Sequence, residues 1–365
     1  MPSSFPPPQP RPAILQTPRE VHGAITPAEL ARLGMDPGQV IDFSANINPY
    51  GPAPGVRSAL TQVAIAAYPD PEARNLRQAL AEHVRQPPAR ILPGHGASEL
   101  IWLIALAFLD PGDRAAVLGP TYGEYARAAR LMGAQTVSWL ASPDDDFAVH
   151  PDAIAQMLGR VQPRLVFLCH PNNPTGQPYP LGALAQWAAA HPTALFVVDE
   201  AYLPFLADGR SALSLEASNI LVLRSMTKDH ALAGLRLGYA VGPDAVIDAL
   251  AQVQPPWSVH AMAQAAGLAS LAAQSWVDAS LAQVREDARA LRRALRALGW
   301  RPHPSATHFF LLPVEDGVQV REGLLRQGVV VRDAASFGLP GHVRIAARTP
   351  AENARLLEAL GRAIA

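Results

Sequence analysis

The pattern that most limits the possible folds of this chain is an alternation of helical stretches with short apolar runs, between about residues 59 and 250. The runs occupy residues 115–118, 136–140, 165–169, 195–198, 220–223 and 237–241. Continuous aliphatic runs of this length are typical of strands buried on both faces, and their alternation with helices indicates βαβ units. We therefore predict an α/β fold with a mostly parallel sheet sandwiched by helices.

The pattern changes in the last third of the chain. Residues 260–298 have Ala, Leu, Arg and Gln at helical spacing, and a final helix is expected from Pro350 onward. Three short apolar runs lie between these helices, at residues 309–312, 329–331 and 343–346. This order predicts a second, smaller α+β domain.

The length of 365 residues favours two domains over one. We predict a large domain from residues 46–255, and a small domain made of residues 21–45 together with 256–365. Residues 1–20 are rich in proline and have no periodic apolar pattern, which predicts a disordered arm.

Composition narrows the possible partners. The net charge is −1 and the charges are balanced, so neither nucleic acid nor a membrane surface is expected as a partner. No apolar run is long enough to cross a bilayer, and the N-terminus lacks a basic segment followed by an apolar one, so we expect a cytoplasmic protein. The single cysteine, Cys169, permits neither an internal disulfide nor a multi-cysteine metal site, and we predict no metal.

Polar motifs follow several of the apolar runs directly. In a doubly wound sheet, ligands bind beyond the carboxyl ends of the strands, so these positions are the first candidates for a site. The motifs are HPNNPTG at residues 170–176, DEAY at 199–202, RSMTK at 224–228 and the glycine-rich GHGASE at 94–99.

In this order the four motifs resemble the fold-type I aminotransferase superfamily, and the resemblance runs from about Val21 to the C-terminus. In SMTKDHALAGLRLGY, Ser225, Lys228 and Arg236 match the family's phosphate-binding serine, Schiff-base lysine and phosphate-binding arginine. The resemblance implies an enzyme with pyridoxal 5′-phosphate as its cofactor, bound to the large domain. The chemistry agrees, because an amine can bind the cofactor covalently while a hydroxyl and a guanidinium neutralise its phosphate. Lysine is rare in this arginine-rich chain, so a surface lysine is the weaker alternative.

The resemblance assigns further cofactor contacts. Asp199 ends an apolar run, where an unpaired carboxylate would be costly, and the family pairs it with the protonated ring nitrogen of the cofactor. A helix N-cap is the alternative for Asp199. Tyr202 and Asn173 match residues that hydrogen-bond the phenolic oxygen of the cofactor, although Tyr202 could equally be a packing residue without the motif.

Four more residues belong to the same expected site. Ala97 and Ser98, in GHGASE, would present backbone N–H groups to the cofactor phosphate at a helix N-terminus, or would simply follow a glycine turn. Tyr122, in PTYGEY, matches the aromatic residue that stacks on the cofactor ring. Tyr68 matches a tyrosine that reaches the phosphate of a neighbouring subunit, which implies a homodimer.

Two subgroups with small phosphorylated amino substrates are close: histidinol-phosphate aminotransferase and L-threonine O-3-phosphate decarboxylase of cobalamin synthesis. DFSANINPYG at residues 42–51, the pair His22–Gly23, and Ala347–Arg348 in place of a Gly-Thr pair resemble the decarboxylase. The expectation is therefore decarboxylation of L-threonine O-3-phosphate to (R)-1-aminopropan-2-yl phosphate, with histidinol-phosphate aminotransferase as the alternative. The deciding factor is which substrate bond lies perpendicular to the cofactor ring.

The substrate residues follow from the same resemblance. Arg344 is expected to bind the carboxylate or phosphate of the substrate. Arg332 is expected to line the same pocket, with a surface salt bridge as an equal alternative. His22 could also be an ordinary turn histidine. The other residues of the expected pocket are Asn46, Asn173, His22 and Gly23.

A cofactor-sensing transcription regulator is a remote alternative from another class. It would need a DNA-binding module, and the short arm before Val21 has no room for a helix-turn-helix.

Overall fold

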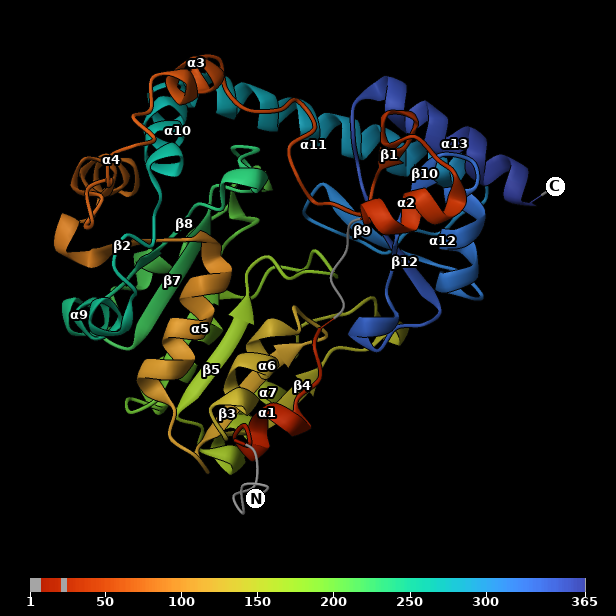
Figure 1. The fold of residues 1–365 in the computed structure, drawn as a ribbon. Helices are drawn as coiled ribbons and strands as arrows, with labels where there is room; N and C mark the ends of the chain where they lie inside the picture. Colours follow the sequence, from red (N-terminus) through yellow and green to blue (C-terminus); the bar gives the residue numbers. More distant parts are fainter. Residues whose placement is uncertain (1–7, 21–24, 365) are drawn as a thin grey trace, which may run out of the picture.

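A seven-stranded sheet forms the centre of the larger part of the molecule in the computed structural model, which describes residues 8–20 and 25–364 (Figure 1). Its strands pair in the order β2 (Ile91–Gly94), β8 (Gly238–Val241), β7 (Ile220–Ser225), β6 (Leu195–Asp199), β5 (Leu165–Cys169), β3 (Arg114–Gly119) and β4 (Gln135–Leu140). The strands from β7 to β4 run parallel, and β8 is antiparallel to both of its neighbours. The prediction of a mostly parallel sheet is confirmed.

Helices cover this sheet. Helix α5 packs on β7 and β8 and lies in front of the sheet in Figure 1, while α6 and α7 pack on β3 and β4. All five residues of β5 and of β6 are buried, as expected for central strands with helices on both faces. The helices of this part are α3 (Val56–Thr61), α4 (Arg74–Val84), α5 (Gly96–Phe108), α6 (Glu124–Leu131), α7 (Pro151–Val161), α8 (Leu181–Ala190), α9 (Asp244–Val253) and α10 (Ala261–Ala272).

Helix α11 (Gln274–Ala297) connects two apolar cores and runs along the top of Figure 1 from the larger part to the smaller one. Val277, Leu281 and Val284 belong to the core around the large sheet, and Ala288, Leu291 and Leu295 belong to the core of the smaller part. These positions are three or four residues apart, so one face of a single helix packs into both cores.

The smaller part contains a three-stranded antiparallel sheet with β9 (Phe309–Pro313), β11 (Arg332–Asp333) and β12 (His342–Ala346), and a parallel pair of β1 (Ile41–Asp42) and β10 (Val329–Val330). Its helices are α2 (Pro27–Leu33), α12 (Gly317–Leu325) and α13 (Pro350–Ile364). The predicted domain boundaries, 46–255 against 21–45 with 256–365, stay a prediction. In the described ranges, no helix is both long and apolar enough to cross a bilayer.

Several elements differ from the expectation. Part of the arm that the proline content predicts to be disordered forms helix α1 (Pro12–Gln16), which begins with proline at its first position and contacts α6. The helical region expected over residues 260–298 consists of two helices, α10 and α11, because Ala273 leaves the helical conformation. Strand β2 was not expected, since Pro93 breaks the pattern. The proline is tolerated because β2 is an edge strand, where one side of the strand has no neighbour to pair with.

Candidate active site

The polar motifs meet at the carboxyl ends of β5, β6 and β7, opposite the first turn of α5, where switch-point ligands bind in α/β sheets. They surround a pocket of about 140 Å³. All the residues expected to contact the cofactor within one subunit line it: Ala97, Ser98, Tyr122, Asn173, Asp199, Tyr202, Ser225, Lys228 and Arg236.

Lys228 is the only lysine among the 365 residues and its amine faces this pocket. Burial lowers the pKa of Lys228 from 10.5 to about 8, with the charges of Arg344 and Arg236 acting in the same direction and Asp199 in the opposite one. A substantial fraction of the amine is therefore neutral near pH 8, and the neutral amine is the nucleophile.

Asp199 is buried at the end of β6. The hydroxyl of Tyr125 donates to its Oδ2 over 2.7 Å, and the N–H of Ala201 donates to its Oδ1 over 2.9 Å. Burial raises the pKa of Asp199 above its ordinary value, while the two hydrogen bonds act the other way. Oδ1 thus caps the turn at Ala201, which agrees with the alternative role of Asp199 as a cap. The carboxylate also lines the cofactor pocket. A cationic ring nitrogen would supply the countercharge that such a buried carboxylate requires.

The sequence reasoning missed Tyr125. Its ring stacks on Phe167 of β5 with the centroids 5.3 Å apart, which fixes the hydroxyl over Asp199. It lies three residues after Tyr122 in PTYGEY, in the first turn of α6, and a second tyrosine so close to an expected site residue was the available signal.

The opposite end of the pocket is suited to a phosphate. Helix α5 begins at Gly96 without a side-chain cap, so its first N–H groups have no intrahelical acceptor. A Cβ built on Gly96, where φ is +76°, would lie only 3.0 Å from the Arg236 guanidinium. The hydroxyls of Ser225 and Thr227 lie 2.8 Å apart on the adjoining strand end. A helix N-terminus, a guanidinium and two hydroxyls together match a phosphate dianion, so the pocket fits pyridoxal phosphate at both ends.

A second cavity of about 260 Å³ continues from the first and shares Tyr122, Asn173, Tyr202 and Lys228 with it. Asn46 lines it, as predicted for a substrate residue. The cavity therefore gives a substrate access to the amine of Lys228.

Two buried guanidinium groups form one wall of this substrate cavity. Arg344 of β12 and Arg332 of β11 are partners in the register of the small sheet. Arg344 donates to the Asn173 side chain and to the backbone oxygen of Ser44, and burial lowers its pKa to about 10. Arg332 is 5% exposed and donates to Ser336 over 2.6 Å. Arg332 also pairs with Asp333, with 3.5 Å between Nη1 and Oδ2, so it forms a salt bridge as its alternative expected, although the guanidinium is buried and lines the cavity.

One predicted cofactor residue lies outside both cavities, and two predicted substrate residues fall outside the described ranges. Tyr68 is 83% exposed on the surface, where its ring contacts Trp257 with the centroids 4.7 Å apart, and it does not line either cavity. His22 and Gly23 lie outside the described residues, so their predicted role stays a prediction.

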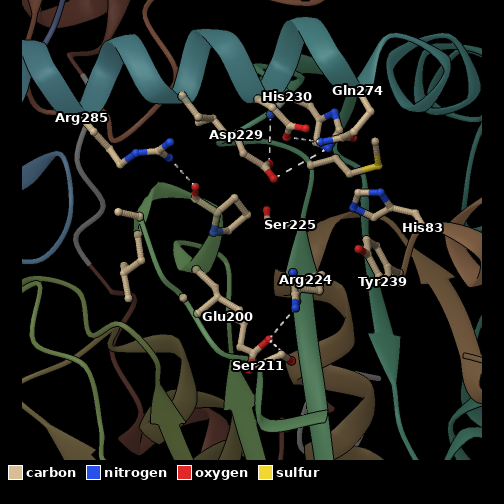
Figure 2. Close-up of a pocket in the computed structure, with 18 residues that line it drawn as sticks. His83, Glu200, Ser211, Arg224, Ser225, Asp229, His230, Tyr239, Gln274 and Arg285 are labelled. Carbon is tan, nitrogen blue, oxygen red and sulfur yellow. Dashed lines mark hydrogen bonds and ion pairs between the residues drawn. The ribbon is translucent and has the colours of Figure 1, made fainter. Parts of the chain in front are cut away.

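A third cavity, of about 390 Å³, lies beside α11 and has Ser225 in common with the cofactor pocket (Figure 2). Its floor holds an ion pair between Glu200 and Arg224, 2.9 Å apart, and Ser211 also donates to Glu200. Because Glu200 is fully buried, the pair compensates charges that would otherwise be costly there. Lys228 is not among the residues that line this cavity. The ion pair between Glu200 and Arg224 instead joins the ends of β6 and β7.

The fold and the two connected cavities define a pyridoxal-phosphate-dependent enzyme of fold type I, with Lys228 as its reactive amine. A model of the aminotransferase class I and II family matches residues 38–360, and the chain belongs to this family. The predicted fold, enzyme class and cofactor are confirmed.

Among its relatives, histidinol-phosphate aminotransferases of Natronomonas pharaonis and Symbiobacterium thermophilum are each 38% identical to it. The matches cover 90% and 89% of this chain, and 93% and 91% of the relatives. The structure of histidinol-phosphate aminotransferase from Sinorhizobium meliloti in complex with pyridoxal 5′-phosphate superposes with a TM-score of 0.85 at 26% identity. It covers 100% of this chain and 99% of the other. A Thermus thermophilus aspartate aminotransferase double mutant has a TM-score of 0.79 at 32% identity, covering 92% and 94%.

These relatives overturn the expectation of a threonine-phosphate decarboxylase. That expectation depended on a few short segments, residues 42–51, His22–Gly23 and Ala347–Arg348. The similarity to histidinol-phosphate aminotransferases extends over about nine tenths of the chain, at 35–38% identity. Short segments near the ends of a cavity can vary within one activity, so the evidence from the whole chain outweighs them.

Proposed function

We propose that this enzyme is a histidinol-phosphate aminotransferase, which moves the amino group of histidinol phosphate to 2-oxoglutarate. The observation that carries the proposal is the pair of guanidinium groups, Arg332 and Arg344, in a cavity that reaches Lys228. Two guanidiniums on neighbouring strands suit a phosphate, because each can donate two hydrogen bonds to its oxygens. The relatives with this activity support the same substrate.

Each residue of the site has a separate role in the proposed reaction. Pyridoxal phosphate supplies, when bound, the electron-withdrawing ring that carries the amino group. Lys228 holds the cofactor and then moves the proton at the amino-bearing carbon of the substrate. Asp199 keeps a proton on the ring nitrogen, and Arg332 and Arg344 hold the substrate phosphate so that its reacting carbon lies at the Lys228 amine.

The proposal predicts the products of a simple incubation. Cofactor-loaded enzyme with histidinol phosphate and 2-oxoglutarate should produce glutamate and the keto phosphate, both measured by mass spectrometry. Arg344→Gln should lower kcat/KM by about 100-fold, because it removes charge-assisted hydrogen bonds to the phosphate. Arg348→Gln is the matched control, since Arg348 pairs with Glu352 outside the cavity, and its KM should stay unchanged. Turnover of aspartate or an aromatic amino acid without turnover of histidinol phosphate would contradict the proposal.

We also propose that the enzyme is a homodimer whose interface covers the exposed apolar side chains of Ile65, Tyr68 and Trp257. Ile65 and Tyr68 are each 83% exposed and Trp257 is 43% exposed, which is unusual for side chains of this size unless a partner covers them. Tyr68 could then reach the cofactor phosphate of the second subunit.

Light scattering coupled to size-exclusion chromatography should therefore report twice the chain mass. Ile65→Asp combined with Trp257→Asp should shift the protein to a monomer. Leu140→Asp, at another exposed apolar residue, is the control and should leave the dimer intact. A wild-type monomer at micromolar concentration would contradict the dimer.

A further inference from the structure

The substrate cavity has one carboxylate in its wall, that of Glu20. The other charged groups that line it in the described part of the chain are cations: Lys228, Arg332 and Arg344. Glu20 follows helix α1, and the arm is attached to the large domain by the contact of α1 with α6 and by Arg127, whose Nε donates to the backbone oxygen of Pro18 over 3.3 Å. A half-buried carboxylate is thus carried into the cavity by an anchored segment.

Gly123 makes room for this carboxylate. A Cβ built on Gly123 would collide with the carboxylate of Glu20, lying 2.5 Å from its Cδ. The backbone of Gly123 has φ −62° and ψ −23°, a conformation that any residue adopts, so no conformational reason requires glycine there. Glycine is needed at this position because the Glu20 carboxylate occupies the space that a side chain would fill.

The Glu20 carboxylate has no hydrogen bond and no ion pair within residues 8–20 and 25–364. Desolvating a carboxylate without a partner is unfavourable, and the cost falls when a ligand brings a donor or a positive charge. Structural carboxylates at such positions are normally paired, as Glu124 is with Arg127 nearby. The geometry therefore points to a partner that enters with the substrate.

We propose that Glu20 is a specificity-determining residue that binds the N–H of a basic ring at the end of the substrate away from its phosphate. The inference depends on the proposed function. In histidinol phosphate the amino-bearing carbon lies between the phosphate and an imidazole. When the phosphate binds Arg332 and Arg344 and the amine lies at Lys228, the imidazole faces the part of the cavity wall that contains Glu20. Imidazole donates one N–H when neutral and two when protonated, with a pKa near 6.5.

Steady-state kinetics of the loaded dimer test the role of Glu20. Glu20→Gln keeps the size but removes the charge, and it should raise KM for histidinol phosphate about tenfold while kcat changes less than about twofold. The increase should be larger at pH 6 than at pH 8, because the imidazole is mostly protonated only at the lower pH. Unchanged KM at both pH values would overturn the inference.

A double-mutant cycle separates recognition from a purely structural role of the arm. Gly123→Ala should displace the carboxylate and raise KM like Glu20→Gln, and it should add little in a Glu20→Ala background. Fully additive effects, or a lower melting temperature with an unchanged KM, would show that Glu20 only anchors the arm.

The failure of the proposed function can be distinguished from the failure of this inference. If the wild type does not turn over histidinol phosphate, the proposed substrate is wrong. Titration of the loaded enzyme with histidinol and with phenylalaninol, followed by cofactor absorbance, then still tests Glu20. Histidinol should bind the wild type more tightly than Glu20→Gln, and phenylalaninol should bind both equally. Equal binding of histidinol would overturn the role of Glu20.

Discussion

Lys228→Ala should lower kcat by at least about 10⁴-fold, because it removes both the covalent attachment of the cofactor and the group that moves the substrate proton. The visible absorbance of the bound cofactor should change to that of the free aldehyde. Lys228 is the only lysine of the chain, so no other side-chain amine can replace it. Borohydride reduction of the wild type should fix the cofactor on the single peptide that contains Lys228, detected by mass spectrometry.

The pKa of Lys228 adds a second test. With a pKa of about 8, the neutral amine predominates above that pH, so the rate at which the apoenzyme captures the cofactor should rise with pH and level off above about pH 8. Thr61→Ala is a suitable control, because Thr61 is exposed and does not line the cofactor pocket. Undiminished turnover by Lys228→Ala, or reduction that labels another peptide, would show that the amine has been assigned wrongly.

Asp199→Asn should lower kcat/KM by about 10³-fold, because the charge that keeps the cofactor ring nitrogen protonated is lost. Tyr125→Phe keeps this charge and removes one hydrogen bond of 2.7 Å, so its effect should be about tenfold. Glutamate formation from histidinol phosphate and 2-oxoglutarate is the measurement for both variants.

The melting temperatures of the apoenzyme and of the cofactor-loaded enzyme distinguish a catalytic role of Asp199 from a capping role. Asp199 is buried and has no ion-pair partner among the described residues, so an asparagine should leave the melting temperature of the apoenzyme unchanged or higher. The additional stability from bound cofactor should shrink in Asp199→Asn. A large loss of stability in the apoenzyme, with kcat/KM preserved, would show that Asp199 acts mainly as a cap for the turn at Ala201.

The cofactor pocket was predictable because its residues belong to local motifs. Ser225 ends β7, and Lys228 and Arg236 follow it before β8. Asp199 ends β6, and Tyr202 lies three residues further on. Parallel strands bring their carboxyl ends to one edge of the sheet, so residues that follow such strands meet whatever the lengths of the helices between them.

The substrate cavity was harder to predict because its walls come from distant segments. Arg332 and Arg344 are brought together by the register of a small antiparallel sheet, and Glu20 comes from an arm whose composition suggested disorder. Short motifs near such walls carry little information about the whole cavity, and the decarboxylase expectation drawn from residues 42–51 and 347–348 was wrong for that reason.

Periodicity and local motifs were sufficient for the α/β class, for six of the seven strands of the large sheet and for the cofactor residues, because each of these is encoded in the pattern of a short stretch of the chain. The break at Ala273, the edge strand β2 with Pro93, and the place of Tyr125 over Asp199 depend on contacts between distant segments. Such contacts gain free energy only after the chain has folded around them, so a local pattern can suggest a residue but cannot specify the contact.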